Sequence, residues 1–410
     1  MSRRLISRSA QHRQLQDSPD LQLLQAEGYE VEVRDGVLLI GHVPYRNAEG
    51  TVSYGTLVSS LELAGNVTAG PINDHVARLA GGVPFNAKGE KWQTIIADEQ
   101  PQQIAGVATA ATLSQKPLGG VPYDDYHQKM STYVAMLSGP ARAIDETATA
   151  QTYPVYTDGD DDSLFHYIDT ASGKAGITTA TEKLKVGSVA IVGLGGTGSY
   201  ILDAIAKTPV EHIHLYDGDR FLQHNAFRSP GAPSLDELQE EVSKVAWFAQ
   251  LYSRMRKNIH PHEVFITEEN IEELREMDFV FIAADSGKAK RLLASKLEEW
   301  GVPFIDVGMG LYDTDGAIGG QLRVTTSTPA FHEHVAANHR ISFADEDAED
   351  AGNVYSLNIQ IAELNALNAA LAVIRWKKHR GFYIDDTFEH NAVYVVNGNA
   401  MINEDKSEIL

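Results

Sequence analysis

A glycine-rich loop at residues 193–198, with the sequence GLGGTG, limits the fold of this chain more than any other segment. The loop follows a short apolar run at residues 188–192 and precedes a helix-like segment at residues 199–207. Glycines in this position let the backbone approach a phosphate, and the amide groups that open the helix point at an anion. Because the loop fits a dinucleotide enzyme as well as an ATP enzyme, it predicts only a strand–loop–helix unit with a phosphate site.

The sequence around this loop alternates between strand-like and helix-like segments. Ser234, with Glu237 three positions later, forms a capping box that predicts the start of a long amphipathic helix reaching about Asn258. Further helices are expected at residues 288–300 and 357–378, and strands at 188–192, 212–216, 263–267, 279–283, 304–307 and 320–325. Such alternation predicts an α/β domain with a Rossmann-like, doubly wound and mainly parallel sheet.

The first part of the chain has a different character, with short β-like runs separated by Gly and Pro turn signals. Residues 152–163 (TYPVYTDGDDDS) then interrupt any periodicity, and 410 residues can form two cores. We therefore expect a smaller α+β domain at residues 1–160 and the α/β domain at residues 161–410. The alternative is that residues 152–163 form only an acidic surface loop.

Composition narrows the classes of partner. A formal net charge of −22 argues against nucleic acid, which is bound through clustered Lys and Arg, and favours a basic or neutral protein partner. The acidity could equally serve only to keep the surface solvated. No apolar run approaches the roughly 18 residues that would span a bilayer, and the basic first residues lack an apolar segment behind them. We expect a soluble, cytoplasmic protein without a membrane partner.

Polar residues follow the predicted strands in an order that favours ATP over a nicotinamide cofactor. An enzyme that joins a carboxylate to the α-phosphate of ATP gathers negative charge, and it needs cations and a carboxylate that holds Mg²⁺. The carboxyl ends of strands are where an open α/β sheet binds its ligand. The residues concerned are Asp217, Asp219, Asn225, Arg228, Lys244 and Asp285.

In this order and spacing, residues 181–380 resemble the ThiF/MoeB/ubiquitin-activating superfamily of adenylyltransferases. The resemblance implies that ATP and Mg²⁺ are bound and that Arg228, Lys244 and Asp285 are catalytic, with Asp285 as the Mg²⁺ ligand. It implies a nucleotide site formed by Gly193, Gly195, Gly196, Gly198, Asp217, Asp219, Asn225, Arg228 and Lys244. The family often carries an Arg ahead of the glycine loop that reaches a neighbouring subunit, and here that segment offers only Lys174.

The chain departs from the family in having no cysteine, which excludes a thioester and a Cys₄ zinc site, so no zinc is expected. Three outcomes stay open: the enzyme stops at the acyl-adenylate, it forms an oxyester on one of its own hydroxyls, or it is a degenerate binding module. Candidate hydroxyls near the end of the sheet are Thr325, Thr326, Ser327, Thr328 and Ser342. The intact nucleotide set argues against degeneracy, and adenylation alone is the simplest outcome.

The histidines and the acidic run at residues 345–350 (DEDAED) are weaker indications of function. His212 with His214, His260 with His262, and the group at residues 332–339 could bind metal, but satisfied structural histidines are the usual outcome. The acidic run is expected to be a solvated loop, or else a docking site for a basic partner.

The resemblance implies a substrate and partners. We expect a ubiquitin-like protein with a C-terminal glycine as substrate, a conjugating-enzyme-like protein as a partner, and a homodimer, in a bacterial conjugation or antiphage defence operon. Residues 1–160 resemble an uncharacterised domain found ahead of ThiF-like domains; it either recognises the modifier or a partner, or it supports the fold or the dimer. Alternatives are a peptide or sulfur-carrier adenylyltransferase, a nicotinamide-dependent oxidoreductase, and a silent scaffold of a conjugation complex.

Overall fold

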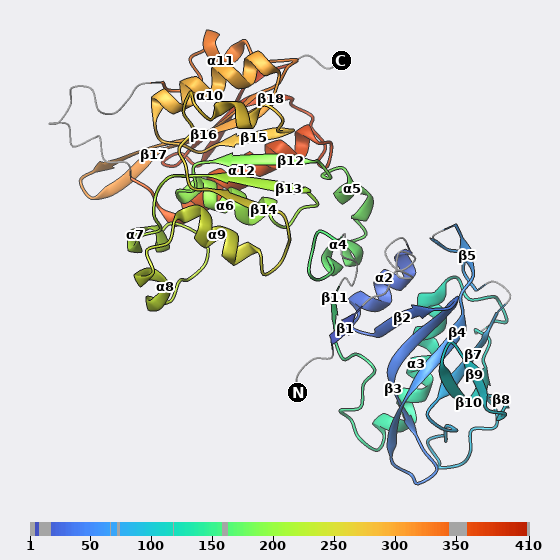
Figure 1. Ribbon diagram of the computed structural model, residues 1–410. Helices are drawn as coiled ribbons and strands as arrows, with labels where there is room; N and C mark the ends of the chain where they lie inside the picture. Colours follow the sequence, from blue (N-terminus) through green and yellow to red (C-terminus); the bar gives the residue numbers. More distant parts are fainter. Residues whose placement is uncertain are drawn as a thin grey trace. The chain divides into compact units, whose positions relative to one another are not determined.

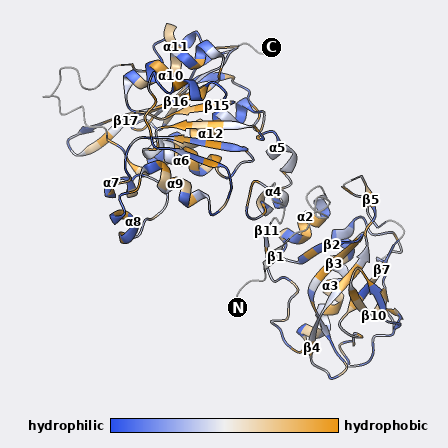
Figure 2. Cartoon of the chain, in the orientation of Figure 1, coloured by the Kyte–Doolittle hydropathy of each residue, from blue (hydrophilic) through white to orange (hydrophobic). Residues whose placement is uncertain are grey.

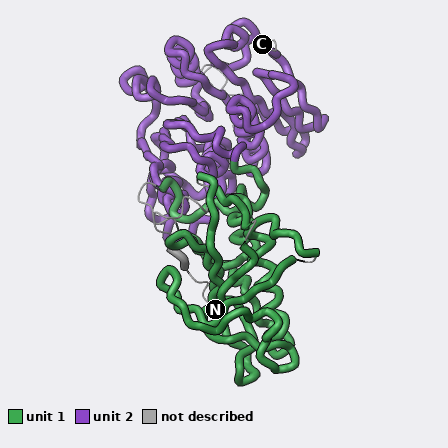
Figure 3. Tube along the Cα trace, turned by 90° about the vertical axis from the view of Figure 1, so that its right-hand side faces the viewer, with its two compact units in different colours: residues 1–178 green, residues 179–410 purple. Residues whose placement is uncertain are grey.

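The computed structural model describes residues 5–7, 18–65, 67–71, 74–117, 119–157, 163–343 and 359–407. The chain divides into two compact units, Met1–Thr178 and Thr179–Leu410, which Figure 3 draws in green and purple. Figure 1 labels the helices and strands of both units. In this described part of the chain, none of the helices combines the length and apolar character needed to cross a bilayer.

Unit 1 is built on an antiparallel sheet with the strand order β2-β3-β4-β7-β10-β8, to which β9 adds beside β10. One face of α3 (Tyr126–Arg142) supplies Tyr126, Met130, Tyr133 and Leu137 to the core against this sheet. The strands are β2 (Glu30–Arg34), β3 (Val37–Arg46), β4 (Val52–Ser60), β7 (Val76–Ala80), β8 (Ile96–Asp98), β9 (Gln102–Ile104) and β10 (Val107–Ser114). The smaller α+β domain expected ahead of the α/β domain is confirmed.

Short elements complete unit 1. Two small pairs lie outside the main sheet, β1 with β11 and β5 with β6. Their bounds, with those of the remaining helices, are β1 (Leu5–Ser7), β11 (Val155–Thr157), β5 (Leu63–Ala64), β6 (Val67–Thr68), α2 (Pro19–Ala26) and α4 (Thr170–Ala175). Helix α5 (Thr178–Glu182) follows at the border of the units.

Unit 2 contains an eight-stranded sheet with the order β14-β13-β12-β15-β16-β17-β18-β19. The four pairings from β14 to β16 are parallel, and the three from β16 to β19 are antiparallel. The strands are β12 (Ser188–Val192), β13 (His212–Tyr216), β14 (Ile259–His262), β15 (Phe279–Ile282), β16 (Phe304–Thr314), β17 (Ala317–Ser327), β18 (Glu389–Val395) and β19 (Ala400–Lys406). The predicted α/β, mainly parallel fold is confirmed.

Helices cover both faces of this sheet, because alternate strand residues point to opposite sides. Val189 and Ile191 of β12 join a core with α6, α9 and α12, whereas Ala190 and Val192 join a core with α10 and the 3₁₀ turn η2. Figure 1 shows the layers, and the strands between them are drawn largely in the hydrophobic colour in Figure 2. The helices are α6 (Gly196–Ile205), α7 (Gln223–Ala226), α8 (Leu235–Gln239), α9 (Lys244–Tyr252), η2 (Ile271–Leu274), α10 (Gly287–Trp300), α11 (His334–Ala337) and α12 (Ala362–His379).

The single helix predicted from Ser234 to Asn258 is wrong. Ser234 and Glu237 do form the capping box, but the helix that it opens, α8, ends at Gln239. The chain then leaves the helical path because Phe221 donates its N–H to the Val242 carbonyl at 2.9 Å. A new helix, α9, begins at Lys244, so this lysine lies at a helix start instead of in a helix interior.

The strand predicted at residues 263–267 is also wrong, because the strand is β14, four residues earlier. Pro261 lies inside β14, where it is tolerated because β14 is the edge strand and pairs only with β13. The apolar residues that suggested a strand belong to the loop that follows, in which Ile266 is buried in the core beside α10.

Candidate functional site

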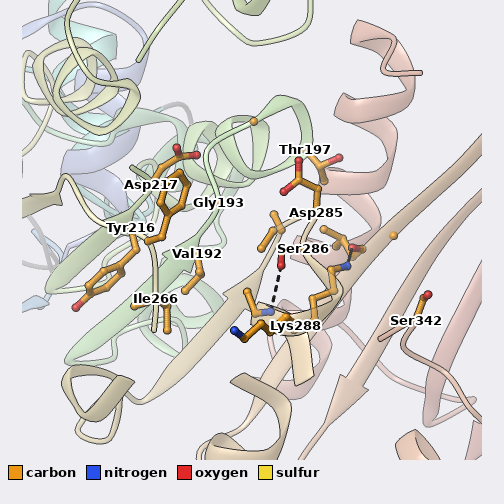
Figure 4. Close-up of a pocket in the computed structure, with 18 of the residues that line it drawn as sticks. Val192, Gly193, Thr197, Tyr216, Asp217, Ile266, Asp285, Ser286, Lys288 and Ser342 are labelled. Atoms are coloured by element: carbon orange, nitrogen blue, oxygen red, sulfur yellow. Dashed lines mark hydrogen bonds between the residues drawn. The ribbon is translucent and has the colours of Figure 1, made fainter. Parts of the chain in front are cut away.

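A cleft of about 1300 Å³ lies at the carboxyl ends of the parallel strands of unit 2. Its wall includes the glycine loop after β12, Asp217 after β13, Asp285 after β15 and residues 307–310 of β16. Figure 4 shows Gly193 and Asp217 on one side of this cleft, with Asp285, Ser286 and Lys288 nearer its centre. The residues predicted to bind a nucleotide therefore come largely to one place.

Two glycines of the loop are required by close packing of backbone. Gly193 has φ +90°, and a Cβ there would lie 2.6 Å from the Ala283 carbonyl oxygen. A Cβ on Gly198 would lie 1.8 Å from the Gly193 carbonyl oxygen. Gly198 is absent from the cleft wall, so it shapes the turn and does not face a ligand. These contacts explain the loop's first and last glycines as packing requirements.

The middle of the loop faces the cleft. A Cβ on Gly196 would lie 2.0 Å from Asn365 Nδ2, whereas a Cβ on Gly195 would meet only Gln360 Oε1, at 4.0 Å. The Gly196 N–H donates to Gln360 Oε1 at 3.3 Å, and Thr197 Oγ1 donates to Asn365 Oδ1 at 2.9 Å. The start of α6 thus lies on the cleft wall, and a phosphate bound there would replace the Gln360 side chain as acceptor of the Gly196 N–H.

Asp217 and Asp219 hold Lys244 at the edge of the cleft. The buried Asp217 carboxylate accepts hydrogen bonds from the N–H groups of Leu194, at 2.7 Å, and Asp219, at 2.9 Å. Lys244 Nζ lies 3.5 Å from Asp217 Oδ1 and 2.6 Å from Asp219 Oδ2. Because the Lys244 N–H also donates to the Asp219 carbonyl at 2.9 Å, the turn after β13 and the start of α9 are held together.

Asn225 and Arg228 have different positions. Asn225 is buried, it does not line the cleft, and its Oδ1 accepts the Leu222 N–H at 2.8 Å. Arg228 does line the cleft, and its buried Nε has no hydrogen-bond partner among the described residues. Desolvation lowers the pKa of the neighbouring His224, and Arg228 and Lys244 lower it further. Asn225 fixes the turn that presents Arg228, and the field there suits an anion.

Asp285 is an exposed carboxylate on the cleft wall, directly after β15. The next residue, Ser286, caps α10 by accepting the Ala289 N–H at 3.3 Å, the dashed line in Figure 4. Within the described ranges no group of three or more metal-binding side chains occurs. Mg²⁺ does not need one, since it commonly takes one or two carboxylates together with phosphate oxygens and water.

ATP and Mg²⁺ fit the residues that are present. The open face of Gly195, the buried Arg228 Nε without a partner and the exposed Asp285 each leave a group that a nucleotide or its metal could engage. Arg228 and Lys244 would hold phosphate oxygens, and Asp285 would hold the metal ion.

A buried ion cluster that the sequence interpretation missed lies under the β16 side of the cleft. Asp306 is fully buried and pairs with Lys290 Nζ, at 2.9 Å, and with Arg323. Lys290 also donates to the Val307 carbonyl at 2.9 Å. The signal was an aspartate inside the apolar strand FIDV at residues 304–307, since a charge buried in a strand needs partners.

The structure separates the candidate hydroxyls. Thr325, Thr326, Ser327 and Thr328 are buried in or beside β17, and Thr325 Oγ1 donates to Asn391 Oδ1 at 2.8 Å. Ser342 is exposed and lines the cleft. The acidic run at residues 345–350 lies outside the described residues.

Four histidines form a ladder across β13 and β14. His212 Nδ1 lies 3.0 Å from His260 Nε2, and His214 Nδ1 lies 3.1 Å from His262 Nε2. Desolvation, followed by the other three histidines, lowers the pKa of His214 to about 4. The rings of Tyr216 and His262 stack with centroids 4.2 Å apart, which connects the ladder to a residue that lines the cleft.

Two family models match this chain. The model of the family described as "ThiF family" matches residues 170–393, and that described as "Domain of unknown function (DUF6791)" matches residues 19–170. Among the curated proteins, none matches this chain.

Solved structures give remote likenesses. A structure of selenomethionine-labelled PaaA is 17% identical, with a TM-score of 0.42 over 56% of this chain and 67% of that one. E. coli MccB with ATP is 16% identical, with a TM-score of 0.43 over 57% and 68% of the two chains. E. coli MccB with selenomethionine-labelled MccA is 16% identical, with a TM-score of 0.42 over 59% and 71%.

Proposed function

The chain belongs to the ThiF family, and from that premise we propose that unit 2 uses ATP to adenylate the C-terminal carboxylate of a ubiquitin-like protein. Family membership supports an adenylyltransferase acting on a carboxylate. The observation that carries the proposal is the convergence of an open phosphate loop, two cations and a carboxylate on one cleft: Gly195, Gly196, Arg228, Lys244 and Asp285.

The proposed reaction is a displacement at the α-phosphate. A carboxylate oxygen of the substrate bonds to that phosphorus, the bond to the bridging oxygen of pyrophosphate breaks, and acyl-adenylate and pyrophosphate result. Charge grows on the phosphate oxygens during this step, so the cations Arg228 and Lys244 stabilise it. Mg²⁺ on Asp285 would neutralise phosphate charge.

The other predicted nucleotide-binding residues have roles that depend on their positions in the cleft wall. Gly195 and Gly196 would donate their N–H groups to phosphate, which for Gly196 requires the Gln360 side chain to move away. Asp217 and Asp219 lie where a ribose would be bound. Lys244 is paired with both aspartates, so its transfer to phosphate requires part of that pairing to loosen. Gly193, Gly198 and Asn225 act by shaping the backbone of the site.

We assign the partners as follows. The substrate ends in glycine, and a conjugating-enzyme-like protein accepts the acyl group either from the adenylate or from a hydroxyl oxyester on this chain. The enzyme works as a homodimer in the cytoplasm, in a bacterial conjugation pathway that serves antiphage defence. Residues 1–160 recognise the modifier or that partner, and residues 161–410 carry the chemistry.

Pyrophosphate exchange into ATP tests the proposal. We expect exchange that depends on a ubiquitin-like protein with a free C-terminal glycine and that falls at least about 100-fold in Arg228→Ala and Asp285→Ala, since each removes charge stabilisation of a few kcal/mol. Lys207→Ala, a matched change of an exposed cation on α6's C-terminal side, should keep wild-type exchange. Exchange with a short free peptide but with no folded modifier would favour a peptide adenylyltransferase, and failure to bind ATP would favour a scaffold.

A further inference from the structure

The two sides of the cleft differ in charge. On the β16 and α10 side, the described lining residues include five cations and one carboxylate, Asp285. The cations are Lys288, Lys290, Arg291, Lys296 and Arg323. On the glycine-loop side, two cations face four carboxylates, which are Asp217, Asp219, Glu268 and Glu269. This excess of cations on one side of the cleft contrasts with the chain's net charge of −22.

The five cations differ in their contacts and in their exposure to solvent. Lys290 and Arg323 pair with the buried Asp306, and Lys296 pairs with Glu299 at 2.8 Å. Lys288 and Arg291 differ from Lys290 and Arg323 in being exposed. They lie three residues apart on α10, so they share the helix face that lines the cleft.

Arg291 is held in place by Phe343. Its Nη2 donates to the Phe343 carbonyl at 3.4 Å, and its guanidinium lies 5.3 Å from the centroid of the Phe343 ring. This contact uses one of the five N–H donors and restricts the side chain, which lowers the entropy lost when the remaining donors bind a carboxylate. Arg291 is therefore prepared for an anionic ligand.

The position of the pair indicates which part of a substrate it would meet. Helix α10 rises about 1.5 Å per residue, so Lys288 and Arg291 lie about 4.5 Å and about 9 Å beyond Asp285 along its axis. An extended peptide advances about 3.3 Å per residue. A substrate whose carboxylate reacts near Asp285 and whose tail follows α10 would meet the pair about one to three residues before its end.

We propose that Lys288 and Arg291 select substrates with acidic side chains one to three residues before the C-terminal carboxylate. This inference rests on the proposed function, because it names the substrate class of the same cleft. The phosphates of ATP do not account for the pair, since Arg228 and Lys244 lie with the glycine loop. The acidic run at residues 345–350 follows Phe343 closely in the sequence and is the competing explanation.

Direct binding tests the inference independently of catalysis. Three fluorescent dodecapeptides ending in Gly-Gly would carry two Glu, two Gln or two Lys immediately before the glycines, and their Kd values would be measured by anisotropy with a non-hydrolysable ATP analogue. We expect the Glu peptide to bind about tenfold more tightly than the Gln peptide, as two screened charge contacts would give, and the Lys peptide to bind most weakly. The double variant Lys288→Glu/Arg291→Glu should reverse this order.

Lys185→Glu/Lys207→Glu is the matched control, because it changes the net charge equally at exposed lysines that do not line the cleft. It should keep the wild-type order. Equal Kd values for the three peptides, or an unchanged order in Lys288→Glu/Arg291→Glu, would overturn the inference and assign the pair to the chain's own acidic run. Charge-ordered binding without pyrophosphate exchange would support this inference while contradicting the proposed adenylation.

Discussion

The two sides of the cleft in unit 2 are held in shape by different interactions. On the glycine-loop side, backbone contacts set the shape: Gly193 and Gly198 pack against carbonyl groups, and Asp217 accepts two backbone N–H groups. On the β16 side, side chains set the shape, with Asp306 buried between Lys290 and Arg323. The first side can tolerate little change in backbone, whereas the second depends on a balance of buried charge.

This difference teaches where each side can be altered. A substitution on the glycine-loop side acts through steric fit, so the loss of stability should differ sharply between neighbouring positions. A substitution on the β16 side acts through charge, so removing one partner should cost more than removing the whole cluster.

The largest effect is expected for Gly198→Ala. The added Cβ would lie 1.8 Å from the Gly193 carbonyl oxygen, and a backbone atom cannot move away cheaply, so unit 2 should lose more than about 3 kcal/mol of stability. Gly195→Ala is the matched change, because its Cβ would meet only Gln360 Oε1 at 4.0 Å. It should keep stability within about 1 kcal/mol and weaken ATP binding. Urea unfolding and nucleotide titration measure both; equal stability of the two variants would contradict the steric account.

Asp306→Ala should cost about 3–5 kcal/mol, because it leaves Lys290 and Arg323 with buried, uncompensated charge. The triple variant Asp306→Leu/Lys290→Met/Arg323→Met removes every charge of the cluster and should recover much of that loss. Urea midpoints give the comparison. A triple variant less stable than Asp306→Ala would show that the β16 side, too, depends on steric fit.

Acid should weaken unit 2 through the histidine ladder beside the glycine-loop side. The folded pKa of His214 is lowered from its usual 6.5 to about 4, and those of His260 and His262 are also lowered, chiefly by desolvation. The unfolded chain therefore binds protons first, so the stabilisation is complete above about pH 6.5 and is lost as the pH falls toward 4. Thermal unfolding of wild type and His214→Phe across this window measures it. The variant should show a shallower decline, and identical declines would exclude the ladder as the cause.

The smallest effect is expected away from both sides of the cleft. Ser234 caps α8 by accepting the Glu237 N–H at 3.2 Å, and Glu237 bonds back to the Ser234 N–H at 2.7 Å. Ser234→Ala should cost about 1 kcal/mol, whereas Ser234→Asp, which retains a capping oxygen, should cost less. Both variants should keep the ATP affinity of the wild type, because α8 lies away from the cleft. A loss of ATP affinity in either variant would show that α8 contributes to the site.

The sequence predicted the parallel part of the sheet well because local signals and tertiary packing agree there. Residues 188–192 and 212–216 are the bounds of β12 and β13, and the apolar runs that predicted them are buried. The prediction of one long helix from Ser234 was wrong because a hydrogen bond between the Phe221 N–H and the Val242 carbonyl interrupts the helix. A local sequence pattern does not indicate such a contact between distant residues. The prediction of a strand after His262 was wrong because a short apolar run in the sequence fits a buried loop as well as a strand.

The candidate site also has a part that the sequence predicts and a part that it does not. The glycine loop, Asp217 and Lys244 follow one another in an ordered pattern, so their position on one cleft could be predicted from the sequence. The β16 side draws Lys288 and Arg291 from α10, Arg323 from β17 and Asn368 from α12. These residues are far apart in the chain and share no motif, so only their packing identifies them as one surface.

The central claim is that a substrate carboxylate attacks the α-phosphate of ATP in the cleft of unit 2. It is tested most directly with a glycine-terminated ubiquitin-like protein whose C-terminal carboxylate carries ¹⁸O, incubated with the enzyme, ATP and hydroxylamine to cleave the acyl-adenylate. Mass spectrometry of the nucleotide products should find one ¹⁸O atom in AMP, and none in pyrophosphate. AMP without ¹⁸O, or label appearing in inorganic phosphate beside ADP, would contradict adenylation by this protein.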